Sequence, residues 1–321
     1  MKFLIVGYGS IGRRHMRNLL ALGEKDILLF RTRQSTLAED ELQGFVVETD
    51  LSKALAHRPD AVIIGNPTAN HIEAALPAAK QGCHILIEKP VSHRLEDALE
   101  FKQVVEQSGT RVLVGFQFRF HPGLLKIKEI LASGEVGRPI DVRAHWGEYL
   151  PDWHPWEDYR KSYSARADLG GGAALTLSHP LDFLRWLLGD AQVLWSSGKK
   201  VSDLEIEVED LAEFQLKFSG GAYGSVHLDY FQQPASLNLE MICSGGSIRW
   251  DNADGTTRVY SAQDKQWQVY PPPEGFERNT LFMDEMRHFI QVVRGEVKPV
   301  CTLDDGIESM RLALTATLVK E

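Results

Sequence analysis

The segment KFLIVGYGSIGRRHMRNLLALG, residues 2–23, decides the fold. It begins with a short apolar run, passes through Gly7, Gly9 and Gly12, and then repeats apolar residues at helical spacing until Gly23. This order predicts a strand, a tight glycine turn and a helix. Glycines at these positions permit the turn, the close approach of a ligand to the backbone, and close packing of the helix on the strand.

The same alternation of strand and helix continues through the first third of the chain. Helical segments separate most of the later apolar runs, and one of these helices follows a capping Asp50. Further strands are expected at ILLF (27–30), FVV (45–47), AVIIGNP (61–67), CHILIEKP (83–90) and RVLVGFQF (111–118). The pattern predicts an α/β domain with a parallel, doubly wound (Rossmann) sheet and right-handed crossovers.

The second part of the chain has a different pattern of apolar and polar residues. Period-two alternation and glycine-rich turns predict an antiparallel or mixed sheet. The expected strands are PIDVRAHWGEYL (139–150), EDLAEFQLKFS (209–219), AYGSVHLDYFQQ (222–233), ASLNLEMICS (235–244) and SIRWDN (247–252). An amphipathic helix, residues 281–295, is expected to close the chain.

Length and composition limit the kind of protein. The 321 residues exceed one usual core, and we expect domains at 1–119 and 120–321. A formal charge of −9 without a basic run disfavours nucleic acid and anionic membrane as partners. The three cysteines are far apart and no segment reaches membrane-spanning length, which favours a cytoplasmic location. We expect no metal site, since Asp304-Asp305-Gly306 is more typical of a helix start than of a calcium loop.

The glycine turn indicates a dinucleotide cofactor. Gly7, Gly9 and Gly12 form G-x-G-x-x-G between a strand and a helix, where the first helical amides, at Ser10 and Ile11, would face a pyrophosphate. The next strand ends in Arg31-Thr32-Arg33, where this fingerprint usually has an acidic residue. Two guanidiniums would bind a 2′-phosphate, so we expect NADP in preference to NAD, with NAD possible. The alternative is that these arginines are a solvated strand end.

The strand at 83–90 ends in Glu88-Lys89-Pro90. Ligands of parallel sheets bind beyond the carboxyl ends of the strands, and Pro90 forbids the ladder to continue. Lys89 is therefore expected where a nicotinamide and its substrate would meet, with Glu88 at the same strand end. A Glu-Lys pair that only ends a strand in water is the alternative.

The segment DLGGGAALTLSHPLDFLRWLLG, residues 168–189, lies in the second part of the chain and combines three consecutive glycines with a following helix. Together with EKP, NPTANH (66–71), GFQFRFHP (115–122) and PVCTLDDG (299–306), it resembles the Gfo/Idh/MocA family, the glucose-fructose oxidoreductase and inositol dehydrogenase group. The resemblance covers nearly the whole chain. It implies a Rossmann domain followed by an α+β domain with a large, open-faced, mainly antiparallel sheet that binds substrate and often mediates oligomers.

The resemblance also assigns residues. It implies that Lys89 and His179 are catalytic, and that Asp182 orients His179 or holds a substrate hydroxyl. The positions that it places beside the cofactor are Asn66, Pro67, His71 and Gln117. Many members carry an aspartate three or four residues before the histidine, where this chain has Thr176 and Leu175.

Four further side chains are candidate substrate contacts. His121 precedes a proline and can serve in a cleft or in a core. The segment WHPWEDYRKSY, residues 153–163, combines aromatic rings and charge, which suits sugar stacking and hydroxyl hydrogen bonds but also suits a core. Its candidates are Trp153, Arg160 and Tyr163.

The expected function is an NAD(P)-dependent oxidoreductase, NADP preferred, acting on the CH–OH group of a sugar, polyol or related compound. Lys89 and His179 would transfer the hydroxyl proton. One alternative is a lyase or glycosidase without net redox change that uses a tightly bound nicotinamide cofactor. Another is a non-catalytic nucleotide sensor. By resemblance we expect a homodimer or homotetramer.

Overall fold

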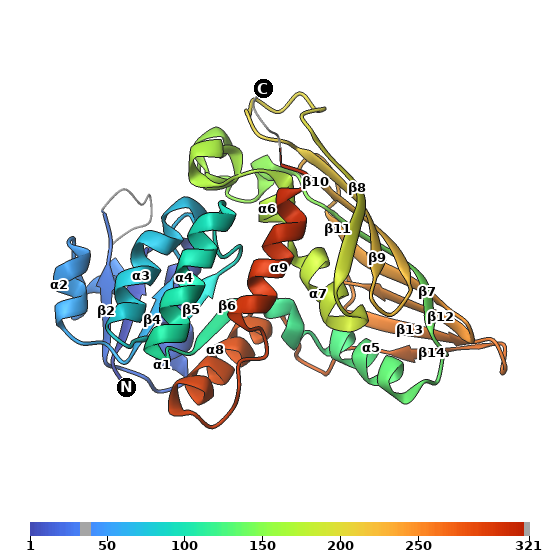
Figure 1. The fold of residues 1–321 in the computed structure, drawn as a ribbon, viewed down its shortest axis with the longest axis horizontal. Coiled ribbons are helices and arrows are strands. Elements are labelled where there is room, and N and C mark those ends of the chain that lie inside the picture. Colours follow the sequence, from blue (N-terminus) through green and yellow to red (C-terminus); the bar gives the residue numbers. More distant parts are fainter. Residues whose placement is uncertain (33–39, 318–321) are drawn as a thin grey trace. The chain divides into compact units, whose positions relative to one another are not determined.

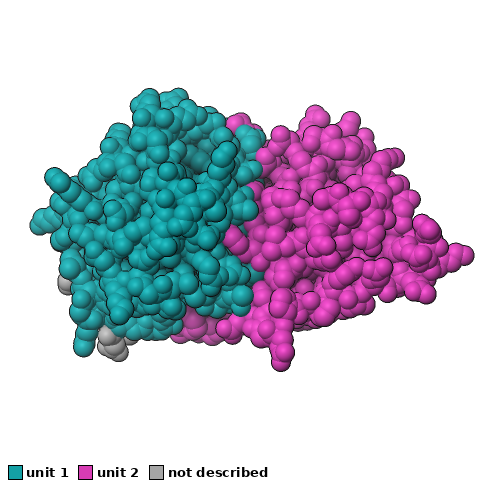
Figure 2. Space-filling view, turned by 90° about the horizontal axis from the view of Figure 1, so that it is seen from below, with its two compact units in different colours: residues 1–117, 278–310 teal, residues 118–277, 311–321 magenta. Residues whose placement is uncertain are grey.

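The computed structural model describes residues 1–32 and 40–317 of the chain. They form two compact units, coloured separately in Figure 2. The first contains residues 1–117 and 278–310, and the second contains residues 118–277 with the C-terminal segment from residue 311. No helix of the described residues is long and apolar enough to cross a membrane.

The first unit is built on a six-stranded parallel sheet (Figure 1). Its order, β3-β2-β1-β4-β5-β6, reverses direction beside β1, which is the doubly wound topology predicted from the alternation. The inner strands are apolar along their whole length because helices cover both faces. The strands are β1 (Phe3–Val6), β2 (Ile27–Phe30), β3 (Val46–Glu48), β4 (Ala61–Ile64), β5 (His84–Glu88) and β6 (Val112–Gly115).

Helices flank this sheet, and their ends follow local signals. Asp50 caps α2, as predicted, by accepting the Lys53 N–H at 3.0 Å. Gly109 ends α4 in the left-handed conformation. The helices of this unit are α1 (Ser10–Ala21), α2 (Leu51–Ala56), α3 (His71–Lys80), α4 (Leu95–Ser108), α8 (Arg278–Arg294) and most of α9 (Leu303–Leu314), with short turns η1 (Asp40–Leu42) and η2 (Thr68–Asn70).

The second unit contains an eight-stranded sheet of order β14-β13-β12-β11-β7-β10-β9-β8. Neighbouring strands are antiparallel except β7 and β10, which run parallel. This confirms the mainly antiparallel sheet. The strands are β7 (Pro139–Gly147), β8 (Ala191–Lys199), β9 (Leu211–Phe218), β10 (Tyr223–Asp229), β11 (Ser236–Cys243), β12 (Gly246–Asp251), β13 (Thr256–Ser261) and β14 (Gln266–Tyr270).

Helices cover one face of this sheet and leave the other open (Figure 1). Helix α5 (Pro122–Ser133) contacts β12 and β13, α7 (His179–Leu188) contacts β7, and the short α6 (Ala173–Thr176) contacts β9 and β10. Side chains alternate accordingly, so that Val142, Ala144 and Trp146 of β7 are buried while Arg143 is exposed. The connections carry five short turns: η3 (Gln117–Phe120), η4 (Leu150–Asp152), η5 (Tyr159–Lys161), η6 (Tyr163–Ala165) and η7 (Ala167–Leu169).

The C-terminal segment differs from the expectation in two respects. Residues 278–310 belong to the first unit, whereas the sequence analysis assigned everything from residue 120 to the second domain. Helix α8 packs its apolar face on α1 and β6, a choice of partner that periodicity cannot give. The amphipathic stretch also does not close the chain, since α9 follows it and begins at the predicted Asp304-Asp305.

Candidate active site

In the glycine turn between β1 and α1, two glycines are required by close packing within the protein, and the third borders open space. A Cβ built on Gly7 would lie 2.8 Å from the Asn66 backbone, and one on Gly12 would lie 2.0 Å from the Gly7 carbonyl oxygen. By contrast, apart from Gly9 itself and its two chain neighbours, no heavy atom of the described residues lies within 4 Å of a Cβ built on Gly9. Packing therefore requires Gly7 and Gly12, while Gly9 borders open space.

The start of α1 faces that space. Gly9 is the N-cap residue, and within the described part of the chain no side chain caps the helix. The amides of Ser10 and Ile11 are thus part of an uncapped helix N-terminus, which binds anions through its N–H groups and dipole. These features suit the pyrophosphate of a dinucleotide, and its contact with Ser10 and Ile11 stays a prediction.

The end of β2 places Arg31 next to the glycine turn. Its guanidinium carbon lies 5.5 Å from the centroid of the Tyr8 ring, and both side chains are buried. Thr32 is exposed, and Arg33 lies outside the described residues. Arg31 thus lies beside Tyr8 of the glycine turn, and binding of a 2′-phosphate by Arg31, Thr32 and Arg33 stays a prediction.

His71 links the loops that follow β4 and β5. Its Nδ1 lies 2.9 Å from the Pro90 carbonyl oxygen, and its Nε2 lies 2.9 Å from the Asn66 carbonyl oxygen. Burial lowers the pKa of His71, so a neutral ring that donates from one nitrogen is favoured. The ring fixes the segment Asn66-Pro67 relative to the segment that carries Lys89, although sequence analysis expected it to line the cofactor.

Glu88 and Lys89 differ sharply in their surroundings at the end of β5. Glu88 is buried, and its Oε1 lies 2.7 Å from His15 Nε2, whereas Lys89 is half-buried. The peptide bond between Lys89 and Pro90 is cis. Glu88 thus anchors the end of the strand from which the Lys89 ammonium extends.

A second carboxyl group, Glu285 of α8, faces this anchor. Glu285 is completely buried, and neither of its oxygens has a hydrogen-bond partner among the described residues. Burial and the neighbouring Glu88 charge raise the pKa of Glu285 well above its ordinary value. Burial and the Glu88 charge therefore favour the protonated form of Glu285 over the carboxylate.

In the second unit, His179 begins α7 inside an aromatic cluster. The His179 ring centroid lies 4.9 Å from that of Phe118 and 5.3 Å from that of Trp146. Phe118 also meets Trp250 edge-on at 6.1 Å. Two aromatic rings thus pack against His179. Sequence reasoning did not single out either ring, because aromatic residues far apart in sequence carry no local signal.

Asp182 lies one turn further along α7 and binds Arg119. Nε and Nη2 of Arg119 donate to Oδ2 and Oδ1 of Asp182 at 2.9 and 2.7 Å. Both side chains are almost completely buried. The sequence analysis missed Arg119, which lies in the quoted GFQFRFHP segment, and the predicted role of Asp182 in orienting His179 stays a prediction.

Neighbouring protein atoms leave no room for a side chain at Gly171 and Gly172, which precede α6. A Cβ on Gly172 would lie 2.2 Å from Glu209 Oε1, and Gly172 has a φ of +112°. A Cβ on Gly171 would lie 2.4 Å from the Tyr163 carbonyl oxygen. Thr176, at the position of the family aspartate, is buried, and its hydroxyl interacts with Tyr230 so as to lower the pKa of that tyrosine, against the larger effect of burial.

The remaining candidates occupy varied environments. His121 caps α5 by accepting the Gly123 N–H at 3.0 Å, and burial lowers the pKa of His121 to about 4. Arg160 is exposed and pairs with Asp158 and Glu205 at 2.8 and 2.5 Å. Trp153 meets the Tyr230 ring edge-on, Tyr163 begins η6, and Gln117 is buried at the start of η3. Their contacts with substrate or cofactor stay predictions.

Comparison with protein families covers both units. A family model described as "Oxidoreductase family, NAD-binding Rossmann fold" matches residues 1–116, and a model described as "GFO/IDH/MocA C-terminal domain" matches residues 124–249. The chain belongs to the Gfo/Idh/MocA family. This confirms the resemblance drawn from EKP, residues 168–189 and the segments quoted with them. It also identifies the protein as an oxidoreductase with an NAD-binding Rossmann domain.

Individual Gfo/Idh/MocA proteins match along almost the whole chain. The scyllo-inositol 2-dehydrogenase (NAD(+)) of Bacillus subtilis is 28% identical over 98% of this chain and 92% of its own. The myo-inositol 2-dehydrogenase of Thermotoga maritima is 26% identical over 98% of this chain and 95% of its own. A levoglucosan dehydrogenase structure with NADH and levoglucosan has a TM-score of 0.86 at 18% identity, covering 98% and 95% of the two chains, which shows the shared fold.

Proposed function

We propose that this protein is an NAD(P)-dependent dehydrogenase that transfers a hydride between nicotinamide and a CH–OH carbon of a sugar or polyol. The observation that carries the proposal is the end of β5, where a buried Glu88 anchors a strand that ends in a half-buried Lys89. That strand belongs to the same sheet as the glycine turn, and ligands of such sheets bind beyond the carboxyl ends of the strands.

The residues proposed to hold the cofactor lie at those strand ends. The amides of Ser10 and Ile11 would bind the pyrophosphate beside Gly9. Asn66 and Pro67, held by His71, would line the nicotinamide side together with Gln117. When bound, the cofactor supplies the hydride acceptor or donor, and the protein supplies position and proton transfer.

We assign proton transfer to Lys89 and His179. The Lys89 ammonium has a proton to give, and the neutral amine formed by its deprotonation has a lone pair to receive the hydroxyl proton. His179 is fixed in orientation by the Phe118 and Trp146 rings, which restricts it to one direction of hydrogen bonding. Thr176 cannot supply a negative charge, so these two residues would carry the proton without the aspartate found in many relatives.

The substrate class follows from relatives and from the cluster around His179. The inositol dehydrogenases named above act on polyols, and levoglucosan is an anhydrosugar. Trp146 and Phe118 offer apolar ring faces beside a histidine that can bind a hydroxyl, a combination suited to a carbohydrate. We therefore propose a cyclic polyol or a pyranose-like sugar, bound by the second unit, which would also mediate a homodimer or homotetramer.

We further propose that NADP is preferred. Arg31 lies beside the glycine turn and provides a permanent positive charge where NAD-specific sites usually have a carboxylate. Thr32 would add a hydroxyl donor, and Arg33 a second guanidinium.

The test is nicotinamide absorbance during incubation with a panel of inositols, sugars, sugar acids and nucleotide sugars, with NADP and NAD in parallel. A substrate-dependent signal that is larger with NADP supports both proposals. A substrate consumed without net change of the nicotinamide would instead indicate the lyase or glycosidase alternative. Tight cofactor binding with no substrate converted would indicate the sensor.

A further inference from the structure

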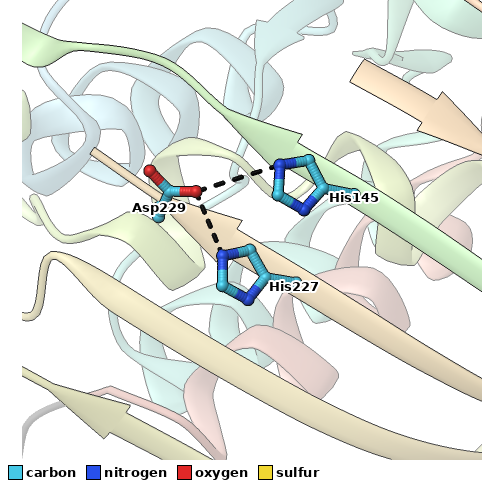
Figure 3. Close-up of side chains that lie close together, drawn as sticks. All are labelled: His145, His227 and Asp229. Atoms are coloured by element: carbon cyan, nitrogen blue, oxygen red, sulfur yellow. Dashed lines mark hydrogen bonds and ion pairs between the residues drawn. The ribbon is translucent and has the colours of Figure 1, made fainter. Parts of the chain in front are cut away.

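A cluster of two histidines and one aspartate lies on the open face of the eight-stranded sheet. His145 of β7 and His227 of β10 are directly paired across the parallel strands. Asp229 follows His227 by two residues, so its side chain is on the same face. Figure 3 shows the Asp229 carboxylate directed at both imidazole rings. None of the three residues belongs to the candidate active site.

The three possible ligand atoms converge. Asp229 Oδ2 lies 3.1 Å from His227 Nε2 and 4.0 Å from His145 Nε2. The two rings are stacked with centroids 4.7 Å apart and planes 5° apart, so both Nε2 atoms face the same region. All three atoms lie within 4.8 Å of one another. Ligands at tetrahedral angles around zinc lie about 3.4 Å apart, so small side-chain rotations would close the site.

Neighbouring groups fix the orientation of these ligands. Asp229 Oδ1 accepts the backbone N–H groups of Phe231 and Gln232 at 2.9 and 2.7 Å, which leaves Oδ2 toward the histidines. His227 Nδ1 lies 2.6 Å from Glu213 Oε1, so this ring has a carboxylate on the side away from Asp229. Histidine ligands of metals are commonly held in this way by a second carboxylate, which also increases their basicity.

The two histidines of the cluster are partly exposed, so an ion can reach them from solvent. The side chains of His145 and His227 are 30% and 32% exposed, while Asp229 is buried. Position 147 is glycine, and a Cβ there would lie 2.3 Å from Asp229 Oδ2, in the way of the carboxylate. The Gln232 side-chain oxygen contacts His145 Nε2 and provides a fourth possible ligand atom nearby.

We propose that His145, His227 and Asp229 bind a divalent transition-metal ion, with Zn²⁺ as the best match. Two imidazole nitrogens and one carboxylate oxygen are a common zinc ligand set, and water or Gln232 can complete four-coordination. The ion would join β7 to β10, the one parallel strand pair in the described sheet, and would stabilise the second unit. The site is independent of hydride transfer.

The test is Zn²⁺ binding to the full chain after treatment with a chelator, measured by calorimetry, with Co²⁺ absorption to report coordination. We expect one ion per chain and a Tm that rises with Zn²⁺. His145→Ala and His227→Ala should each weaken binding by about 100-fold or more, because each removes a direct ligand. His57→Ala is the matched control, since His57 is an exposed histidine with its Nε2 2.9 Å from Glu48.

A third variant protects the test against loss of folding. Glu213→Gln keeps all three ligands and should weaken Zn²⁺ binding about 10-fold, as loss of a supporting carboxylate does. Absence of Zn²⁺ binding to the wild-type chain, or binding equal in the His227→Ala and His57→Ala variants, would overturn the proposal. The cluster would then be a charged hydrogen-bond network only.

Discussion

Arg119 binds Asp182 through two parallel hydrogen bonds, of 2.9 and 2.7 Å, in a place where both side chains are at most 2% exposed. The pair joins the turn that starts the second unit to the helix that begins at His179. A two-point guanidinium–carboxylate pair fixes distance and direction together. The position of α7, and with it that of the candidate catalytic His179 at its start, therefore depends on Arg119.

Removing one partner of this pair should be costly. Arg119→Met leaves a buried carboxylate without its cation, and we expect the free energy of unfolding to fall by about 3–5 kcal/mol. The double variant Arg119→Met, Asp182→Leu should recover most of the loss. Urea denaturation of the two variants measures this, and a double variant no more stable than the single one would contradict the account.

Glycine 9 and glycine 12 should respond differently to alanine. Gly9→Ala places its Cβ in open space and should leave Tm unchanged while weakening NADP and NAD binding. Gly12→Ala places its Cβ 2.0 Å from the Gly7 carbonyl oxygen and should lower Tm. Thermal unfolding and cofactor fluorescence titration separate the two effects. Equal losses of stability in both variants would refute the distinction.

Glu285 should make the protein less stable as the pH rises. The ordinary pKa of a glutamate is 4.5, and the folded state raises the pKa of Glu285 above it. At a pH between the unfolded-state pKa and the higher folded-state pKa, the folded protein holds a proton that the unfolded protein has lost. The stability contribution of Glu285 therefore falls with increasing pH in that range. Glu285→Gln should gain stability over the wild type as the pH rises above about 4.5, while exposed Glu296→Gln should not. Urea midpoints at several pH values measure this.

Arg31 should control the choice of cofactor. Arg31→Ala is expected to weaken NADPH binding by about 10-fold or more and to leave NADH binding less affected, because only NADPH carries the 2′-phosphate. Arg17→Ala, an exposed arginine of α1 paired with Glu41, is the control. Competition titrations with both cofactors check the prediction. An equal loss of affinity for NADH and NADPH would mean that Arg31 stabilises the glycine turn at Tyr8 and does not bind the 2′-phosphate.

Much of the first unit could be predicted from the sequence because its signals are local. Apolar runs ended by glycine, asparagine or proline marked the strands, and the ends of parallel strands meet at one edge, so Gly9, Asn66 and Lys89 could be expected near the same ligand. The family resemblance added His179, which no local pattern would have connected to Lys89.

The interactions that fix these residues could not be predicted, because they join distant parts of the chain. Glu285 reaches Glu88 only because α8 returns to the first unit, and amphipathic periodicity does not name the surface that a helix covers. The His145–His227 pair depends on the parallel register of two non-consecutive strands. Alternation along a strand gives the face on which a side chain lies, but it does not give the register between strands.

The most direct test of the proposed function is Lys89→Ala, compared with Lys53→Ala, an exposed lysine of α2. With a substrate found in the panel, kcat and the dissociation constant of the nicotinamide cofactor are measured for both variants. We predict that kcat falls by about 10²–10⁴-fold in Lys89→Ala, while the cofactor still binds and Lys53→Ala behaves as the wild type. Full turnover by Lys89→Ala would contradict the assignment of proton transfer to the end of β5.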